Sequence, residues 1–124
     1  MERLGTSFYA SEREVTVNGV YRFFDEGGAK RGFDDSSETW FRNHPDETAW
    51  LVPEEITITP AADEYRLACN EDTALDVHQC SFIARYDVFV TDLSVRTIAS
   101  KHDEFAILVS DIDGRFNACL SNER

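Results

Sequence analysis

The sequence predicts one α+β domain over residues 1–124, in which an antiparallel β-sheet with an N-terminal hairpin packs one face against a C-terminal amphipathic helix. Three observations carry this prediction. A hairpin pattern occupies residues 14–24, a long apolar strand occupies 80–93, and apolar residues recur at helical spacing over 103–120. A chain of 124 residues has the size of one domain with a single layered core.

The N-terminal hairpin is predicted from Asn18-Gly19. Both residue types tolerate positive φ, and a two-residue type I′ turn requires positive φ at both central positions. β-Branched and aromatic residues flank the pair on both sides within residues 14–24. We therefore expect the chain to reverse at Asn18-Gly19.

The region after the hairpin is predicted to be irregular. Residues 25–37 contain three glycines and mixed charges, a composition typical of a flexible loop. Residues 35–38 read Asp-Ser-Ser-Glu, the form of a capping box, and predict a short helix that must end before Pro45. Residues 46–52 fit either a further helical turn or a loop.

Three further strands are predicted. Residues 55–59 alternate and are rich in β-branched types, and flanking prolines place them near an edge of the sheet. Residues 64–69 form a second strand. Residues 80–93 form the third, which is apolar on both faces over much of its length. Such strands are typical of the centre of a sheet, so we expect residues 81–93 to be the central strand.

The C-terminal segment allows two interpretations. Asp113-Gly114 lies between apolar runs and fits a second hairpin turn. The apolar residues instead follow helical spacing, which favours a helix over 103–120 packed on the sheet through Phe105, Leu108, Ile112 and Phe116. The full apolar stripe comprises Phe105, Leu108, Val109, Ile112, Phe116, Cys119 and Leu120.

The three cysteines predict one bridge and one buried thiol. Cys69 and Cys80 flank a polar stretch between two predicted strands, so a disulfide is expected there, with two reduced thiols as the alternative. Cys119 lies on the apolar stripe of the helix and is expected to be reduced and buried. No Cys/His cluster with zinc spacing is present, so the sequence predicts no metal site and no cofactor.

The C-terminal half resembles a group of bacterial proteins. Residues 85–94 read as a strand of the form Arg-Tyr-x-x-x-Val, and residues 108–115 read as a helix of the form Leu-x-x-x-Ile-Asp-x-Arg. With the paired cysteines, residues 69–124 resemble the strand-then-helix ending of bacterial exported or lipoprotein-type domains of unknown function. The resemblance implies an extracytoplasmic location rather than a cytoplasmic one. It implies no activity and no functional residue.

The charge of the chain limits its partners. It carries 24 Asp and Glu against 12 Lys and Arg, a net charge of −12. Phosphates would be repelled, so nucleic acid is excluded as an expected partner and anionic membranes are disfavoured. No apolar run reaches the length of a membrane span. Simple solubility, a basic protein, a cation or a neutral ligand all remain compatible with this charge.

One region stands out as a candidate binding site. Aromatic residues are frequent at binding hot spots, and several gather in the irregular stretch between the hairpin and the next strand. The alternative is that they fill the core. The predicted ligand- or partner-binding residues are Trp40, Phe41, Arg42, His44 and Trp50.

Three functions follow from these observations. The first is a non-enzymatic binding or sensor module that recognises a partner protein or small ligand outside the cytoplasm. The second is an acidic inhibitor or immunity-type protein that neutralises a basic partner. The third is a small enzyme that uses one of the loop histidines His44, His78 or His102. No catalytic residue is assigned, because the sequence carries no nucleophile or phosphate-loop motif.

Overall fold

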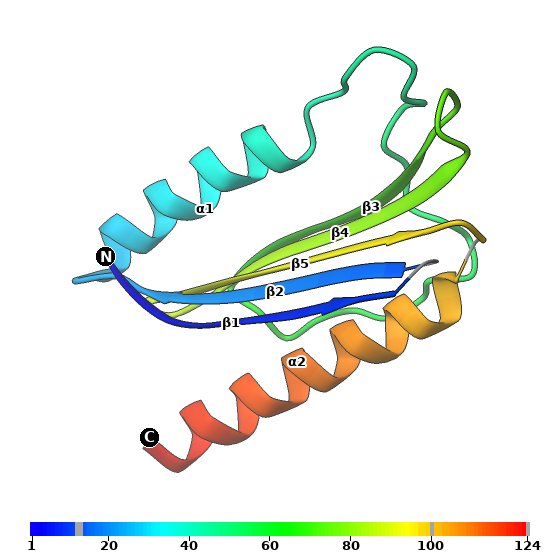
Figure 1. Ribbon diagram of the computed structural model, residues 1–124. Helices are drawn as coiled ribbons and strands as arrows, with labels where there is room; N and C mark the ends of the chain where they lie inside the picture. The colour runs from blue at the N-terminus through cyan, green and yellow to red at the C-terminus, as the bar shows by residue number, and fades with distance from the viewer. Residues whose placement is uncertain (12–13, 100, 124) are drawn as a thin grey trace.

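A computed structural model describes residues 1–11, 14–99 and 101–123 and shows a five-stranded antiparallel sheet between two helices (Figure 1). The strand order is β1-β2-β5-β4-β3. The α+β architecture, the N-terminal hairpin and the C-terminal helix are confirmed. The elements are β1 (Glu2–Ala10), β2 (Glu14–Arg22), α1 (Glu26–Trp40), β3 (Glu64–Asp72), β4 (Val77–Tyr86), β5 (Phe89–Thr97) and α2 (His102–Glu123).

The N-terminal hairpin pairs β1 with β2, so the predicted turn at Asn18-Gly19 is wrong. Both residues lie inside β2, and φ of Gly19 is not positive. Long-range contacts explain the extended backbone. The Asn18 side-chain amide donates to the Asp92 carbonyl at 2.5 Å, and the Gly19 N–H donates to the Asp92 carboxylate at 2.9 Å. A side chain at position 19 would collide with that carboxylate and with the Tyr21 hydroxyl, so glycine serves close packing here.

The glycine-rich segment forms α1, so the loop predicted over residues 25–37 is wrong. Asp25 is the N-cap and its carboxylate accepts from the Gly28 N–H at 2.7 Å. The predicted capping box at 35–38 lies inside the helix rather than at its start. The helix ends at Trp40, before Pro45 as expected. The face of α1 that is buried against the sheet presents Ala29, Phe33 and Ser37.

The helical glycines Gly32 and Gly114 should respond oppositely to alanine. A Cβ at Gly32 would lie 2.2 Å from the Phe23 ring. Gly32→Ala should therefore lower the free energy of unfolding by about 1–3 kcal/mol through overpacking. A Cβ at Gly114 meets no described atom within 4 Å. Gly114→Ala should raise it by about 1 kcal/mol, because alanine favours helix. Urea unfolding measures both changes, and a stabilised Gly32→Ala variant would contradict the Phe23 packing.

The long strand predicted over residues 80–93 is in fact two strands. β4 ends at Tyr86 and β5 begins at Phe89, with Asp87 at φ 59° in the turn between them. A central strand is therefore present, but it is β5, with β2 and β4 on its two sides. The strand expected at 64–69 is confirmed within β3. The strand expected at 55–59 is wrong, because that segment is irregular and inserts Ile56 into the core.

The C-terminal helix expected over 103–120 is confirmed as α2. Phe105 and Val109 are fully buried against the sheet, and Leu108, Ile112 and Phe116 are partly buried there. The ring of Phe116 also stacks on Tyr86 of β4, with ring centroids 4.4 Å apart. Cys119, expected in the core, is instead an exposed free thiol. Its side chain lines the hollow between α2 and the β1–β2 hairpin rather than the core.

Asp113 fastens the middle of α2 to the rest of the domain. Its carboxylate accepts from the Tyr86 hydroxyl at 2.6 Å and from the Ala61 N–H at 3.0 Å. Burial and the contact with Asp113 together raise the pKa of Tyr86 well above its ordinary value. Because α2 runs from His102 to Glu123, the Asp113-Gly114 pair continues the helix rather than forming the alternative turn.

Cys69 and Cys80 lie at disulfide distance, as expected. They face each other across β3 and β4, with Cα atoms 4.1 Å and sulfur atoms 2.10 Å apart. The backbone explains the approach. The Cys69 N–H donates to the Leu51 carbonyl and the Cys69 carbonyl accepts from the Leu51 N–H, on the side of β3 away from β4. Residues 69 and 80 therefore form a non-hydrogen-bonded pair, in which facing side chains come closest.

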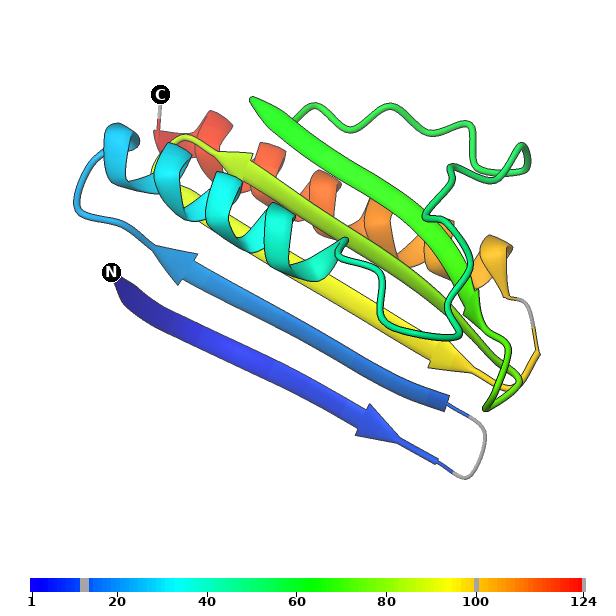
Figure 2. The ribbon, with the colours of Figure 1, turned by 90° about the horizontal axis from the view of Figure 1, so that it is seen from above.

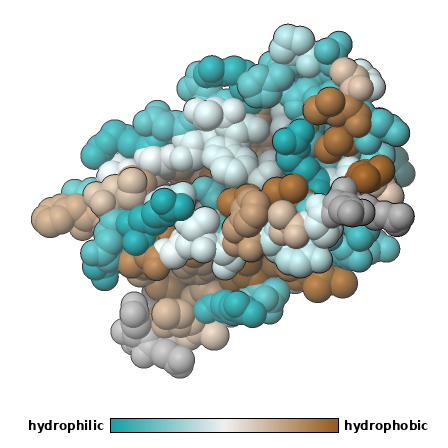
Figure 3. Space-filling model, viewed as in Figure 1, coloured by the Kyte–Doolittle hydropathy of each residue, from teal (hydrophilic) through white to brown (hydrophobic). Residues whose placement is uncertain are grey.

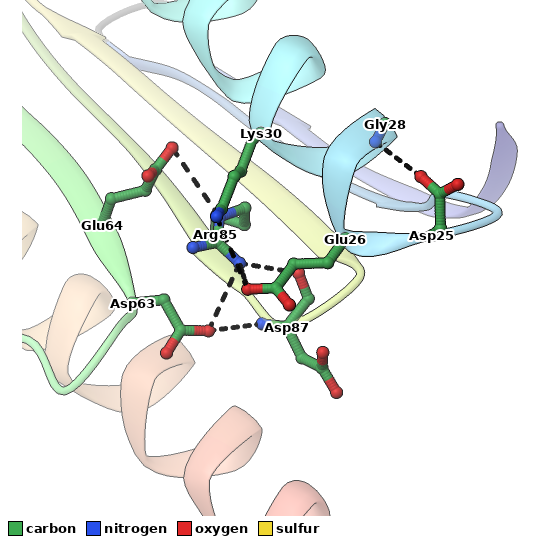
Figure 4. A network of polar contacts seen from close by, with 8 residues as sticks. All are labelled: Asp25, Glu26, Gly28, Lys30, Asp63, Glu64, Arg85 and Asp87. Atoms are coloured by element: carbon green, nitrogen blue, oxygen red, sulfur yellow. Dashed lines mark hydrogen bonds and ion pairs between the residues drawn. The ribbon is translucent and has the colours of Figure 1, made fainter.

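A buried arginine holds the end of the sheet where α1 begins (Figure 4). The Arg85 side chain is 5% exposed, and its guanidinium lies 3.4 Å from Glu26, 3.5 Å from Asp63 and 3.7 Å from Glu64. It also donates to the Asp87 carbonyl at 2.9 Å. These contacts connect β4 with the first turn of α1, the start of β3 and the β4–β5 turn.

The two helices leave one part of the sheet uncovered. α1 packs on β4 and β5, and α2 packs on β4 from the opposite face. The view from above shows β1 and β2 lying clear of both helices (Figure 2). The β1–β2 hairpin therefore projects beside α2 and bounds the groove described next.

Within the described part of the chain, neither helix is long and apolar enough to cross a lipid bilayer.

Candidate ligand-binding groove

The groove lies between α2 and the face of the β1–β2 hairpin that looks toward it. One part of the groove, toward the C-terminal end of α2, has a volume of about 300 Å³. Apolar side chains from both walls dominate the lining, and two polar residues stand among them. The lining residues are Leu4, Asn18, Val20, Phe89, Ile112, Arg115, Phe116, Cys119 and Leu120.

A second hollow of about 400 Å³ continues along the same side of α2. It uses the preceding turns of the helix and the preceding residues of β2, so the two hollows follow one another along the helix axis. Figure 3 shows apolar side chains gathered over β1 and beside α2 on this face. The second hollow is lined by Tyr9, Glu14, Thr16, Glu104, Ile107 and Leu108.

The polar groups of the groove divide into two kinds. Asn18 is committed to the fold, because its side-chain amide already donates to Thr91 and to the Asp92 carbonyl. The charged groups lie at the rim. Arg115 pairs with Asp111 at 2.9 Å in an exposed contact one helical turn apart. The floor of the groove is thus apolar, and charge is confined to its margins.

The rim carries more acid than base. Glu14 and Glu104 border the second hollow, and Lys101 lies 3.9 Å from the first and 3.6 Å from the second. One ammonium therefore faces two carboxylates. With Arg115 matched by Asp111, the described rim retains a net negative charge, consistent with the −12 of the whole chain.

β1 makes the outer wall of the groove and one edge of the sheet. All nine of its residues are exposed, including Phe8 at 68% and Tyr9 at 58%. A bulge between Arg3 and Gly5 inserts Leu4, which enters the groove lining. An edge strand with exposed apolar side chains is typical of an interaction surface.

The structure divides the five predicted site residues between the core and the surface. Phe41 is buried and meets the Trp50 ring edge-on at 5.2 Å, and the Arg66 guanidinium lies 4.3 Å above the Phe41 ring. Trp40 and Trp50 are half-buried against the core beneath α1. The aromatic members of the set therefore fill the space between α1 and the sheet.

The two remaining predicted site residues, Arg42 and His44, are exposed in the segment after α1. The His44 backbone N–H donates to the Glu47 carboxylate at 2.7 Å, which orders the local turn. None of the five predicted residues lines the groove beside α2. The predicted region and the groove are separate features of the molecule.

The histidines bear on the enzyme hypothesis, which a histidine beside a buried carboxylate would strengthen. His78 lies 3.3 Å from Glu71 and His102 lies 3.2 Å from Glu55, and both glutamates are more than half exposed. Among the described residues the buried carboxylate is that of Asp92, whose pKa is raised by burial and partly lowered again by the Gly19 N–H. The partners of His78 and His102 in the described residues are therefore exposed carboxylates rather than Asp92.

Sequence reasoning missed two features. The groove depends on Leu4 and Tyr9, from a segment that was assigned to no strand, although Arg3-Leu4 and Phe8-Tyr9 gave some strand signal. The other feature is the approach of His102 to Cys69 and Cys80, which no spacing in the sequence indicates. Both arise from the topology of the sheet.

The groove itself has the volume and apolar lining of a ligand site. The apolar floor and the acidic rim indicate the chemical properties of a ligand that would fit the groove. No protein family, curated protein or solved structure matches this chain.

Proposed function

We propose that this protein is a non-enzymatic binding module whose groove receives a basic, amphipathic helical segment of a partner protein. One observation carries the proposal: an apolar trough runs along α2 and is bordered by an excess of carboxylates. An amphipathic helix places its apolar face in such a trough and keeps its charged face in solvent. A basic charged face would meet Glu14 and Glu104 at the rim.

The shape of the groove supports an extended occupant. α2 has 22 residues, and a helix of that length extends about 33 Å. The two hollows follow its apolar side in sequence, from Ile107 to Leu120. A compact ligand would fill one hollow and leave the other open. A helical segment with apolar residues three and four apart would contact both.

The location proposed for this module is outside the cytoplasm. The support is the Cys69–Cys80 pair at disulfide distance, because such pairs persist in oxidising compartments. The resemblance of residues 69–124 to exported bacterial domains supports the same location.

The acidic inhibitor is the closest competing function, and it predicts binding by charge alone. Aspartate substitutions separate the two. Ile107 is 68% exposed in the second hollow and Leu4 is 48% exposed in the first, so Ile107→Asp and Leu4→Asp should leave the fold intact. Each variant adds negative charge and removes apolar contact. The groove therefore predicts weaker binding, whereas attraction by charge alone predicts equal or tighter binding.

The probe is a synthetic helical peptide with leucines on one face and lysines on the other, followed by fluorescence anisotropy. We expect each aspartate variant to weaken binding by about tenfold or more, as the loss of a buried apolar contact implies. The matched control is Phe24→Asp, since Phe24 is 97% exposed and lines neither hollow. Unchanged binding by both groove variants, or equal loss in the control, would contradict the proposal.

The charge of the peptide provides the second arm. A peptide with glutamate in place of every lysine should bind at least tenfold more weakly, because the rim then repels it. Raised salt should lower the affinity of the lysine peptide without abolishing its binding, since the apolar contact remains. Equal affinity for both peptides would show that the acidic rim has no part in recognition.

A further inference from the structure

A second site is formed by the cysteine pair and the first residue of α2. One ligand atom each from Cys69, Cys80 and His102 lie within 4.8 Å of one another. The cysteines are 7% and 6% exposed, and the His102 side chain is 23% exposed. Two sulfurs and an imidazole nitrogen are the donors that Zn²⁺ prefers.

We propose that reduction of the Cys69–Cys80 bond creates a Zn²⁺ site, with the two thiolates and His102 as protein ligands and water in the fourth position. In tetrahedral zinc sites the metal–ligand bonds place neighbouring donor atoms about 3.5–3.8 Å apart. The present separations are all within 4.8 Å, so the His102 ring would need to move by at most about 1 Å once the sulfurs separate. The His102 side chain is partly exposed, so a rotation of its ring can supply such a shift.

The chemistry of the change balances. A dithiol reductant transfers two electrons and two protons to the Cys69–Cys80 bond, which becomes two thiols, and the reductant becomes a disulfide. On binding Zn²⁺ the two thiols release two protons to solvent, and His102 coordinates as the neutral imidazole. The cation and two thiolates then sum to zero charge, which a protein of net charge −12 readily accommodates.

Glu55 is the positioning residue of this site. Its carboxylate lies 3.2 Å from Nδ1 of His102. When Nδ1 carries the proton that it donates to Glu55, Nε2 has the free lone pair that a metal needs. A carboxylate on the second nitrogen is the usual support of a metal-bound histidine.

The surroundings provide an entry path and a consequence. A hollow of about 330 Å³ lined by Glu55, Lys101, His102, Asp103 and Glu104 opens beside the site and is largely polar. The disulfide connects only β3 and β4, whereas a metal held by His102 would also fasten the start of α2 to the sheet. The site takes no ligand from the groove, so failure of either proposal leaves the other testable.

The experiment compares one protein in two redox states. The chain is reduced with dithiothreitol, freed of it anaerobically and titrated with Zn²⁺, and bound metal is measured by elemental analysis. We expect one Zn²⁺ per reduced chain and none per oxidised chain. Co²⁺ in place of Zn²⁺ should give thiolate-to-metal charge-transfer absorption. No binding by the reduced chain, or equal binding by the oxidised chain, would overturn the proposal.

Variants identify the ligands. His102→Ala should weaken Zn²⁺ binding by at least a hundredfold, and Glu55→Gln by about tenfold, the range for a supporting residue. The matched control His44→Ala removes an exposed histidine elsewhere and should bind like the wild type. Circular dichroism of each oxidised variant confirms that it is folded. Wild-type affinity in His102→Ala would exclude the site.

Discussion

Replacing Phe105 by alanine should lower the free energy of unfolding by about 3–5 kcal/mol. The ring is 1% exposed, in the first turn of α2, and belongs to the core between α2 and the sheet together with Phe82 and Tyr86. Its loss removes the apolar contact and leaves a cavity that fully packed neighbours cannot close. Urea unfolding followed by circular dichroism measures the change.

Leu108→Ala is the matched comparison for Phe105→Ala. Leu108 lies on the same stripe but is only partly buried, since it also lines the groove. Its truncation should cost about 1–2 kcal/mol, less than the loss of a fully buried leucine. A larger effect at Leu108 than at Phe105 would mean that α2 packs on the sheet through a different face.

Replacing Arg85 by alanine should lower the free energy of unfolding by about 2–4 kcal/mol. The guanidinium is buried among Glu26, Asp63 and Glu64 (Figure 4), and its removal leaves three carboxylates facing one another. Those carboxylates keep partial access to water, so the effect stays below that of an unpaired charge in the deep interior. Arg85→Lys should recover part of the loss, because it restores the charge without the planar fork.

Arg115→Ala is the control for the Arg85 variants. Arg115 pairs with Asp111 on the surface of α2, with a side chain 78% exposed. Exposed pairs contribute little, so the change should stay within about 0.5 kcal/mol. Thermal or urea unfolding of the variants decides the matter, and equal losses at Arg85 and Arg115 would contradict the burial of the Arg85 network.

Elements with strong local periodicity could be predicted from the sequence. The apolar stripe of α2 was sufficient to choose a helix over a hairpin at Asp113-Gly114, because seven apolar positions outweigh one glycine. The Cys69–Cys80 pairing was also accessible, since two strands separated by a short polar stretch pair antiparallel. These predictions rest on residues close together in the chain.

The errors arose where distant residues decide the local conformation. Asn18-Gly19 has the composition of a turn, but β5 supplies the partners that hold both residues extended. The glycines of α1 lower helix propensity, but the Asp25 cap and the burial of Phe33 compensate. The β4–β5 turn contains neither glycine nor asparagine, and its one turn-type residue, Asp87, was too weak a signal to separate the two strands.

The candidate sites were less accessible than the fold. The aromatic cluster of Trp40, Phe41 and Trp50 was recognised from composition, and the structure shows that its members pack beneath α1. The groove was not recognised, because it exists only where the β1–β2 hairpin extends past α2. The α2 wall was predicted from its apolar stripe, whereas β1 was assigned to no strand, and the strand order that brings the two walls together is a property of the whole sheet.

The placement of Asn18-Gly19 within β2 has a chemical consequence for the lifetime of the protein. An Asn-Gly pair in a mobile turn ages readily, because the glycine backbone nitrogen attacks the asparagine side-chain carbonyl, closes a succinimide and releases ammonia. In β2 the Gly19 N–H is engaged by Asp92 and the Asn18 amide is held by Thr91, in an extended backbone. Ring closure must wait until β2 separates from β5. Isoaspartate at position 18 would therefore record how often the centre of the sheet opens.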